Sequence, residues 1–205
     1  MDRKNILKIF ESRAADWIAK NPKPEGPFQV AHLPQASPGR ERIVAVLKAG
    51  HEKKPIKSVL DLGCGISRWA PLFLEGLGIP KYTGVEPARA LNEEALRRVP
   101  EIEGVEILLG DLLGFADKLS HFRRWDLGFT FTVLEHIPPE DIAAVAEIIK
   151  KKCRSLVAIE MTRATAAAGF CEYVFQHDYA ALFGPWKFAE DVDENKTLMS
   201  WDFSK

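Results

Sequence analysis

Residues 59–65 read Val-Leu-Asp-Leu-Gly-Cys-Gly, an apolar stretch with one acidic residue that opens into a loop containing two glycines. Because glycine has no Cβ atom, such a loop can turn tightly and lie directly against a ligand. In open parallel sheets, a strand followed by a glycine-rich turn and a helix borders a nucleotide-type pocket. The segment therefore predicts an α/β fold with a ligand at the carboxyl end of this strand.

Apolar segments alternate with helical segments from residue 57 onwards. Strands are expected at 57–62, 81–86, 105–109, 126–131 and 154–161, and helices at 67–76, 87–99 and 138–152. A helix at 179–183, capped by Asp178, precedes two strands at 186–192 and 196–203 that flank a hairpin turn. The pattern predicts a doubly wound, mostly parallel sheet with helices on both faces and an antiparallel hairpin at the end of the chain.

The first 56 residues precede this pattern, and we expect them to form a helical extension packed on a single domain of residues 1–205. A helix is expected at 3–20, where Ile6, Phe10, Ala14 and Trp17 recur at helical spacing. Prolines interrupt residues 21–38. A second helix is expected from Ser37-Pro38 to Ala49, with Gly50 as its C-terminal cap.

Composition excludes several classes of protein. The 205-residue chain has a net charge of −1, which does not favour binding to nucleic acid or to an anionic membrane. No apolar run is long enough to span a bilayer. The three cysteines have no metal-like spacing and indicate free thiols in a reducing compartment, so we expect a cytoplasmic protein. The sequence does not predict the oligomeric state.

Acidic residues follow the first three strands, at Asp61, Glu86 and Asp111. A carboxylate at Glu86 can accept two hydrogen bonds from a ribose diol. Asp111, with the backbone N–H of Leu112, suits the edge of an adenine ring. Arg68 stands at the third glycine position of a dinucleotide motif, which argues against a pyrophosphate ligand and hence against a dinucleotide oxidoreductase.

These segments resemble the motifs of the class I S-adenosylmethionine-dependent methyltransferases, with motif I at 60–65, motif II at 84–86, motif III at 110–111 and motif IV at 126–136. The resemblance implies a seven-stranded sheet and S-adenosylmethionine as cofactor. It places Gly63 and Gly65 at the methionine moiety, Glu86 at the ribose and Asp111 at the adenine. The predicted cofactor-binding residues are Asp61, Gly63, Cys64, Gly65, Glu86, Pro87, Asp111, Leu112 and Thr132. Many family members have a further glycine where this chain has Ser67.

The candidate catalytic residues are Glu135, His136 and His177, because histidine suits a general base near neutral pH. Each has a structural alternative. His136 can bond to backbone at the start of a helix, and Asp178 can cap a helix that leaves His177 on the surface. Tyr179, Trp17 and His32 are further acceptor-side candidates, although Tyr179 also suits a packed position after the Asp178 cap and Trp17 a core anchor. Cys64 suits a small residue in a tight loop.

The leading hypothesis is transfer of the methyl group to a small-molecule acceptor by in-line displacement, with residues 1–38 as a lid over the acceptor. The alternative is a non-catalytic S-adenosylmethionine-binding protein or partner subunit. Glu135-His136 and the distant His177 also resemble a metal-assisted RNA 2′-O-methyltransferase. Thr132, however, stands where that site has its first glutamate, so no metal, nucleic-acid or membrane partner is predicted. The amino-methylating motif Asn/Asp-Pro-Pro-Tyr/Phe is absent after the fourth strand.

Overall fold

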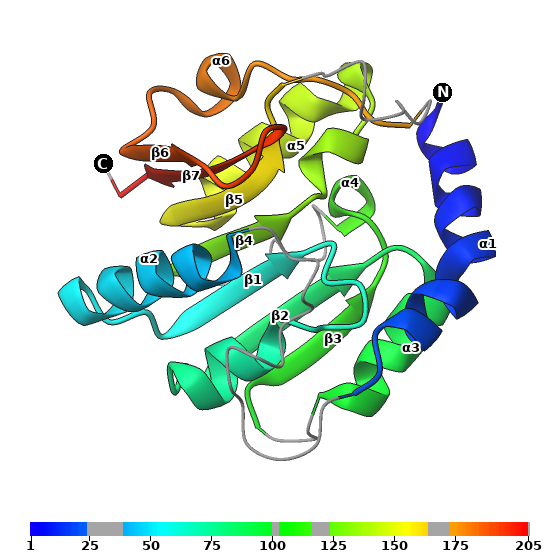
Figure 1. Ribbon diagram of the computed structural model, residues 1–205, viewed down its shortest axis with the longest axis horizontal. Coiled ribbons are helices and arrows are strands. Elements are labelled where there is room, and N and C mark those ends of the chain that lie inside the picture. The colour runs from blue at the N-terminus through cyan, green and yellow to red at the C-terminus, as the bar shows by residue number, and fades with distance from the viewer. Residues whose placement is uncertain (24–38, 100–102, 116–123, 164–172, 205) are drawn as a thin grey trace.

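A mixed sheet of seven strands forms the centre of the protein (Figure 1). The computed structural model describes residues 1–23, 39–99, 103–115, 124–163 and 173–204. The strands are β1 (Ser58–Leu62), β2 (Lys81–Glu86), β3 (Val105–Leu109), β4 (Leu127–Phe131), β5 (Ser155–Met161), β6 (Phe188–Asp191) and β7 (Lys196–Asp202). The predicted fold class is confirmed.

The strand order is β3-β2-β1-β4-β5-β7-β6. Strands β1 to β5 are parallel, whereas β7 runs antiparallel to both β5 and β6. The chain reverses its direction of winding between β1 and β4, where an open sheet leaves a crevice outside its carboxyl ends. The loops after β1, β2, β3 and β4 therefore surround one possible ligand site.

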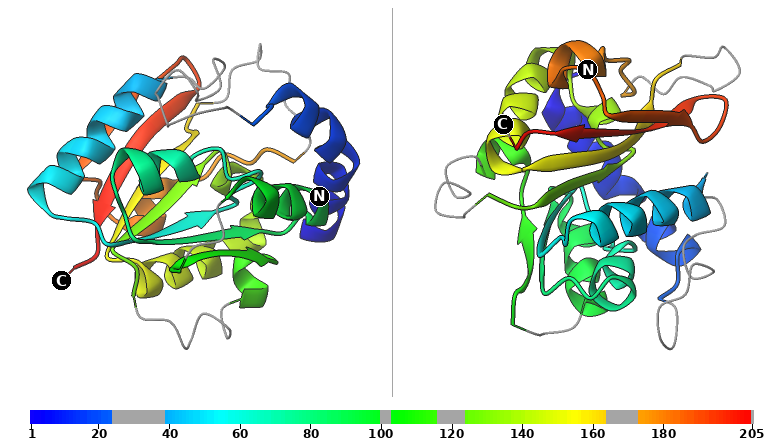
Figure 2. Two further views of the ribbon diagram at one scale, coloured as in Figure 1. Left: turned by 90° about the horizontal axis from the view of Figure 1, so that it is seen from below. Right: turned by 90° about the vertical axis from the view of Figure 1, so that its left-hand side faces the viewer.

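Helices cover both faces of the sheet (Figure 2). The helical elements are α1 (Arg3–Lys20), α2 (Arg40–Lys53), the π-helical η2 (Leu72–Gly76), α3 (Arg89–Arg98), α4 (Leu112–Phe115), the 3₁₀-helical η4 (Leu134–His136), α5 (Pro139–Lys152) and α6 (Tyr179–Phe183). Along β1, Val59 packs with α2 and η2 on one face, whereas Leu60 and Leu62 pack with α5 and α6 on the other. This alternation follows from the two-residue period of a strand.

The first helix stands beyond the carboxyl ends of the strands, on the right of Figure 1. Its Ala14 is buried against Ile66 of the loop after β1 and Leu91 of α3. The carboxylate of Glu11 accepts hydrogen bonds from the backbone N–H groups of Arg89, at 2.5 Å, and Ala90, at 3.4 Å. Since the first N–H groups of a helix have no partner within it, Glu11 caps α3 from a different part of the chain.

Two expectations about the helices need correction. The segment after β1 forms turns and then the π-helical η2, in place of a regular helix over 67–76. Pro71 precedes η2 and its ring has no N–H to donate to a regular helical ladder. Gly50 is not a cap, because α2 continues to Lys53. The short α4 was not predicted, and Ser37-Pro38 and most of the proline-rich stretch lie outside the described residues.

Two glycine substitutions test this description. Gly50→Ala is expected to stabilise the protein by about 0.5–1 kcal/mol, because alanine favours a helix interior and a Cβ atom there meets nothing within 4 Å. Gly84→Ala is expected to destabilise it by about 1–3 kcal/mol through overpacking, since its Cβ would lie 2.8 Å from the Cys64 sulfur. Urea unfolding measures both. A destabilising Gly50→Ala would restore the cap interpretation.

Candidate active site

The loop after β1 comes close to the loop after β4 and is open on its other side. Gly63 and Gly65 have φ angles of 62° and 56°, which L-residues with a side chain rarely adopt. A Cβ atom on Gly63 would lie 2.7 Å from two methyl carbons of Val133. A Cβ atom on Gly65 would meet nothing within 4 Å. The two glycines thus permit a tight turn that leaves room for a ligand beside Gly65.

Glu86, at the end of β2, holds two loops together. One carboxylate oxygen accepts from the N–H of Gly65 at 2.9 Å, and the other from the N–H of Ala88 at 2.8 Å. Burial raises the pKa of Glu86 to about 7, and these two hydrogen bonds act in the opposite direction. Because each carboxylate oxygen has two lone pairs, both can accept a further bond from a ligand.

Asp61 and Cys64 lie behind the loop. The Tyr82 hydroxyl donates to the carboxylate of Asp61 at 2.6 Å, and burial raises the pKa of Asp61 to about 7. The Cys64 side chain is buried, and burial raises the pKa of its thiol well above the usual value. A thiol of this kind is a poor nucleophile, which supports the interpretation of Cys64 as a small residue in a tight loop.

A pocket of about 60 Å³, open to solvent, lies between the loops after β1, β2 and β3 and helix α5. Gly63, Pro87, Asp111 and Leu112 line it, so four predicted cofactor residues from three loops meet there. Apolar side chains complete its walls, including Val85, Leu113 and Val133. The prediction named none of these three, because apolar residues around a strand end are indistinguishable in sequence from ordinary core residues.

Asp111 also contacts the first helix. Its carboxylate accepts from the Gly114 N–H at 2.7 Å, and the Arg3 guanidinium lies 3.4 Å away. Both side chains of this ion pair are partly exposed, so the pair stabilises the fold only weakly. Arg3 lies at the mouth of the pocket as one of its lining residues.

The residues after β4 adopt an unusual backbone. Thr132 has a φ angle of 56° and its N–H donates to the Ile159 carbonyl at 2.8 Å. A β-branched residue in this region is strained, and such strain clusters at functional sites. Thr132 precedes Val133, the residue that contacts the loop after β1. The strain therefore places the loop after β4 against the predicted methionine end of the cofactor site.

Glu135 and His136 lie together in the short helix η4 after β4. Glu135 is buried, and its carboxylate accepts from the Met161 N–H at 2.7 Å and lies 3.8 Å from Nε2 of His136. Nδ1 of His136 lies 3.0 Å from the Tyr173 carbonyl oxygen. A carbonyl only accepts, so Nδ1 carries the proton and Nε2 has a lone pair. Burial lowers the pKa of His136, which keeps the ring neutral at pH 7.

His177 is held by backbone atoms. Its Nε2 lies 3.0 Å from the Ile137 carbonyl oxygen, and burial lowers the pKa of the half-buried ring. Asp178 caps α6 through the Ala181 N–H, and Tyr179 is buried, as the structural alternative requires. In the part of the chain that the structure describes, no group of three His, Cys, Asp or Glu residues is arranged to hold a metal ion. His32 lies outside that part.

Glu160, in β5, is a site residue that sequence reasoning missed. Its buried carboxylate accepts from the backbone N–H groups of Val133, at 3.0 Å, and Glu135, at 3.2 Å. Burial raises the pKa of Glu160 to about 8. An acidic residue within the apolar run Leu-Val-Ala-Ile-Glu-Met was the available signal, since a buried carboxylate needs hydrogen-bond donors.

Comparison with known proteins identifies the class. Residues 59–155 match the family of methyltransferase domains. No curated protein matches the chain. Together with the fold, the family match confirms the predicted class I methyltransferase, and the chain carries a methyltransferase domain that includes the loops after β1 to β4.

Solved structures share this fold at low sequence identity. The structure of magnesium protoporphyrin IX methyltransferase (ChlM) from Synechocystis PCC 6803 with bound SAH has a TM-score of 0.67 at 16% identity, and the match covers 97% of this chain and 98% of that one. The DhpI–SAH complex has a TM-score of 0.65 at 19% identity, covering 96% and 94%. An rRNA methylase from Escherichia coli gives 0.56 at 15% identity, covering 96% and 75%. These likenesses establish the fold and leave the acceptor open.

The buried Glu160 generates a prediction about stability. Its pKa is about 8 in the folded protein and 4.5 as the ordinary value. Between these values the folded state binds more protons than the unfolded state, so stability falls as pH rises. We expect the free energy of unfolding to fall by about 1–2 kcal/mol from pH 6 to pH 8 through this group. Denaturant unfolding at both pH values measures it, and Glu160→Gln should weaken the dependence. An unchanged slope in that variant would contradict the assignment.

Proposed function

We propose that the protein transfers a methyl group from S-adenosylmethionine to a small-molecule acceptor by in-line displacement. The observation that carries the proposal is the Glu86 carboxylate, which the N–H groups of Gly65 and Ala88 fix in place and whose chain neighbours, Val85 and Pro87, line the open pocket. When bound, the cofactor supplies a methyl group already activated on a positively charged sulfur. The protein's task is then mainly to position the acceptor, which contributes about 7–11 kcal/mol in favourable cases.

The residues fit an adenosyl ligand in the order of the strands. Gly63 and Gly65 leave room for the methionine moiety, with Asp61 and Cys64 supporting the loop from behind. Glu86 accepts from the ribose hydroxyls. Pro87, Asp111 and Leu112 line the pocket that receives the adenine. The backbone conformation of Thr132 directs the loop after β4 toward the methyl group.

On the acceptor side, His136 serves as the general base through the lone pair of Nε2, taking the proton that the acceptor atom loses as it bonds to the methyl carbon. Glu135 positions His136 and stabilises its protonated form across 3.8 Å. His177 is the weakest of the three candidates, because its Nε2 donates to a backbone carbonyl. Its role is to position the loop that contains Ile137.

We propose that α1 is part of the lid predicted for residues 1–38 and covers this site; residues 24–38 of that lid lie outside the described residues. Along α1, Arg3 contacts Asp111, Phe10 packs edge-on against His136 at 5.1 Å, and Trp17 lies against Arg68. Trp17 is 42% exposed, so it is not the core anchor that its spacing suggested. One helix thus touches residues at the adenine end and at the acceptor end.

A small molecule is favoured over RNA because the chain carries a net charge of −1. In the described residues, no helix is both long and apolar enough to cross a membrane. The free, buried thiols of Cys64 and Cys153 fit the proposed cytoplasmic location. A non-catalytic cofactor-binding protein is the alternative that the same pocket would also support.

Calorimetry and turnover test the proposed function. We expect S-adenosylmethionine and S-adenosylhomocysteine to bind and NAD not to bind, with formation of S-adenosylhomocysteine over a panel of metabolites. Glu86→Ala should weaken binding about tenfold to a hundredfold, as expected for lost hydrogen bonds to a charged group. Glu86→Gln retains the volume and controls for loss of packing. Cofactor binding without turnover on any metabolite favours the non-catalytic alternative, and binding of NAD alone would overturn the proposal.

A second prediction concerns the lid. Glu11→Ala removes the cap that α1 supplies to α3 and should cost about 1 kcal/mol of docking, or about a fivefold rise in the open fraction. Amide hydrogen exchange in α1 measures the opening, and turnover should fall while the fold persists. Asp16→Ala, an exposed change on the same helix, is the matched control. Equal exchange in both variants would contradict the role of Glu11 as a latch.

A further inference from the structure

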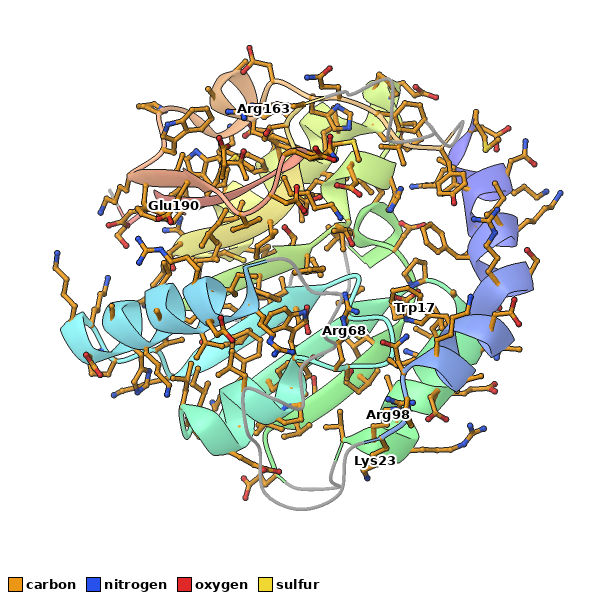
Figure 3. All side chains as sticks on the ribbon, viewed as in Figure 1. Trp17, Lys23, Arg68, Arg98, Arg163 and Glu190 are labelled. Carbon is orange, nitrogen blue, oxygen red and sulfur yellow. The ribbon has the colours of Figure 1, made fainter. Side chains whose placement is uncertain are left out.

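Arg68 lies at the third glycine position of the dinucleotide motif, and the cofactor contacts proposed above give it no task. Its guanidinium carbon lies 4.9 Å from the ring centre of Phe131 and 5.2 Å from that of Trp17. Figure 3 shows Arg68 near the centre of the molecule, with Trp17 directed toward it from α1. The last residue of β4 and the predicted lid thus hold one cation between them.

Among the residues that the structure describes, no acidic side chain forms an ion pair with Arg68. Within the described ranges, Arg3, Arg42, Arg98, Arg154 and Arg163 each form an ion pair with a carboxylate. Arg68 has no carboxylate oxygen within 4 Å among the same residues. Asp61 acts on it electrostatically, but the Asp61 carboxylate already accepts from Tyr82. Burial lowers the pKa of Arg68 to about 10, so the group remains charged at neutral pH.

The contacts of Arg68 leave its N–H groups available to donate hydrogen bonds. Cation–π contacts with Phe131 and Trp17 hold the guanidinium without supplying an oxygen acceptor for its N–H groups. A guanidinium presents these donors as a planar fork that matches the two oxygens of a carboxylate or phosphate. A partly buried fork of this kind is therefore suited to an oxyanion that arrives with a ligand.

The position of Arg68 indicates which end of the ligand it would meet. It does not line the pocket that contains Asp111, and it contacts Phe131, the residue directly before Thr132. A second cation, the amino group of Lys196, lies 6.0 Å from the ring centre of Phe131. Two cations, Arg68 and Lys196, thus lie near the ring of Phe131 at the end of β4, where the methyl group is proposed to leave the cofactor.

We propose that Arg68 binds a carboxylate or phosphate-type oxyanion of the methyl acceptor and thereby selects anionic small molecules. This inference rests on the proposed function. The same chemistry is present in the carboxylate of the cofactor's methionine moiety, and binding measurements distinguish the two sources. Trp17 couples recognition to closure, because the ring that orients Arg68 belongs to the lid.

The first arm measures affinity for the donor. S-adenosylhomocysteine and 5′-methylthioadenosine, which lacks the amino-acid moiety, are titrated into the wild type, Arg68→Met and Arg68→Lys. We expect each ligand to bind the three proteins within about twofold. Arg154→Met is the control, since Arg154 is half-exposed and pairs with Asp126 near the opposite ends of the strands. A loss of affinity in Arg68→Met that is confined to S-adenosylhomocysteine would assign Arg68 to the donor and overturn the acceptor assignment.

The second arm measures the acceptor side directly. Protein loaded with S-adenosylhomocysteine is melted with benzoate, phenylacetate and phenyl phosphate, each beside an uncharged partner: benzamide, phenylacetamide and phenol. We expect the anions alone to raise the melting temperature, in the wild type and Arg154→Met but not in Arg68→Met. Arg68→Lys should retain a smaller part of the shift, because it keeps the charge and loses the fork. Equal shifts with charged and uncharged probes, or no shift dependent on Arg68, would overturn the proposal.

Turnover separates this inference from the proposed function. Over a metabolite panel, the wild type should favour anionic acceptors, and Arg68→Met should lower kcat/KM for them about tenfold to a hundredfold. If the wild type methylates only neutral or cationic members, the function stands and the inference fails. If it binds the cofactor and methylates none, the proposed function fails, and the melting experiment still decides whether Arg68 holds an anion.

Discussion

The Glu86 carboxylate is the interaction on which the arrangement of the site depends. It connects the loop after β1 to the loop after β2 through the N–H groups of Gly65 and Ala88. These groups lie in turns that sheet hydrogen bonds do not reach. Burying a carboxylate destabilises the folded state unless hydrogen-bond donors surround it, so the two loops and the side chain stabilise one another. Glu11 of the first helix acts in the same way, because its carboxylate caps α3 immediately after Ala88.

Buried acidic groups repeat this principle around the crevice. Asp61 accepts from a tyrosine, and Glu160 accepts from two N–H groups of the loop after β4. Burial raises the pKa of Asp61, Glu86 and Glu160. Their stabilising effect in the protonated form is lost as pH rises through about 7–8. The loops are thus held by hydrogen bonds to carboxyl groups. The guanidinium of Arg68, in contrast, lies on the proposed acceptor side.

The first helix gives these loops a common cover. It contacts Asp111, at the proposed adenine end, through Arg3, and His136, at the proposed acceptor end, through Phe10. It contacts the loop after β1 through Ala14 and Trp17. Its buried side chains are few, Ile6 and Ala14 among them. A helix with so little buried surface can separate from the domain at modest cost. That balance suits a lid that must admit a cofactor and an acceptor and then exclude water.

The sequence by itself determined the succession of strands and helices along the chain. Backbone geometry gives a strand an apolar period of two residues and a helix a period close to four, and both periods are visible in the sequence. The sequence also located Gly63, Glu86, Pro87, Asp111 and Leu112 at strand ends, which parallel pairing brings to one edge. It could not show that helix α1 lies across that edge, that Glu11 caps a helix 78 residues away, or that Trp17 and Phe131 hold Arg68. The rule that a glycine caps the end of a helix also placed the end of α2 wrongly, at Gly50. Those contacts join residues distant in the chain, and only the packing of the whole domain decides which distant residues meet.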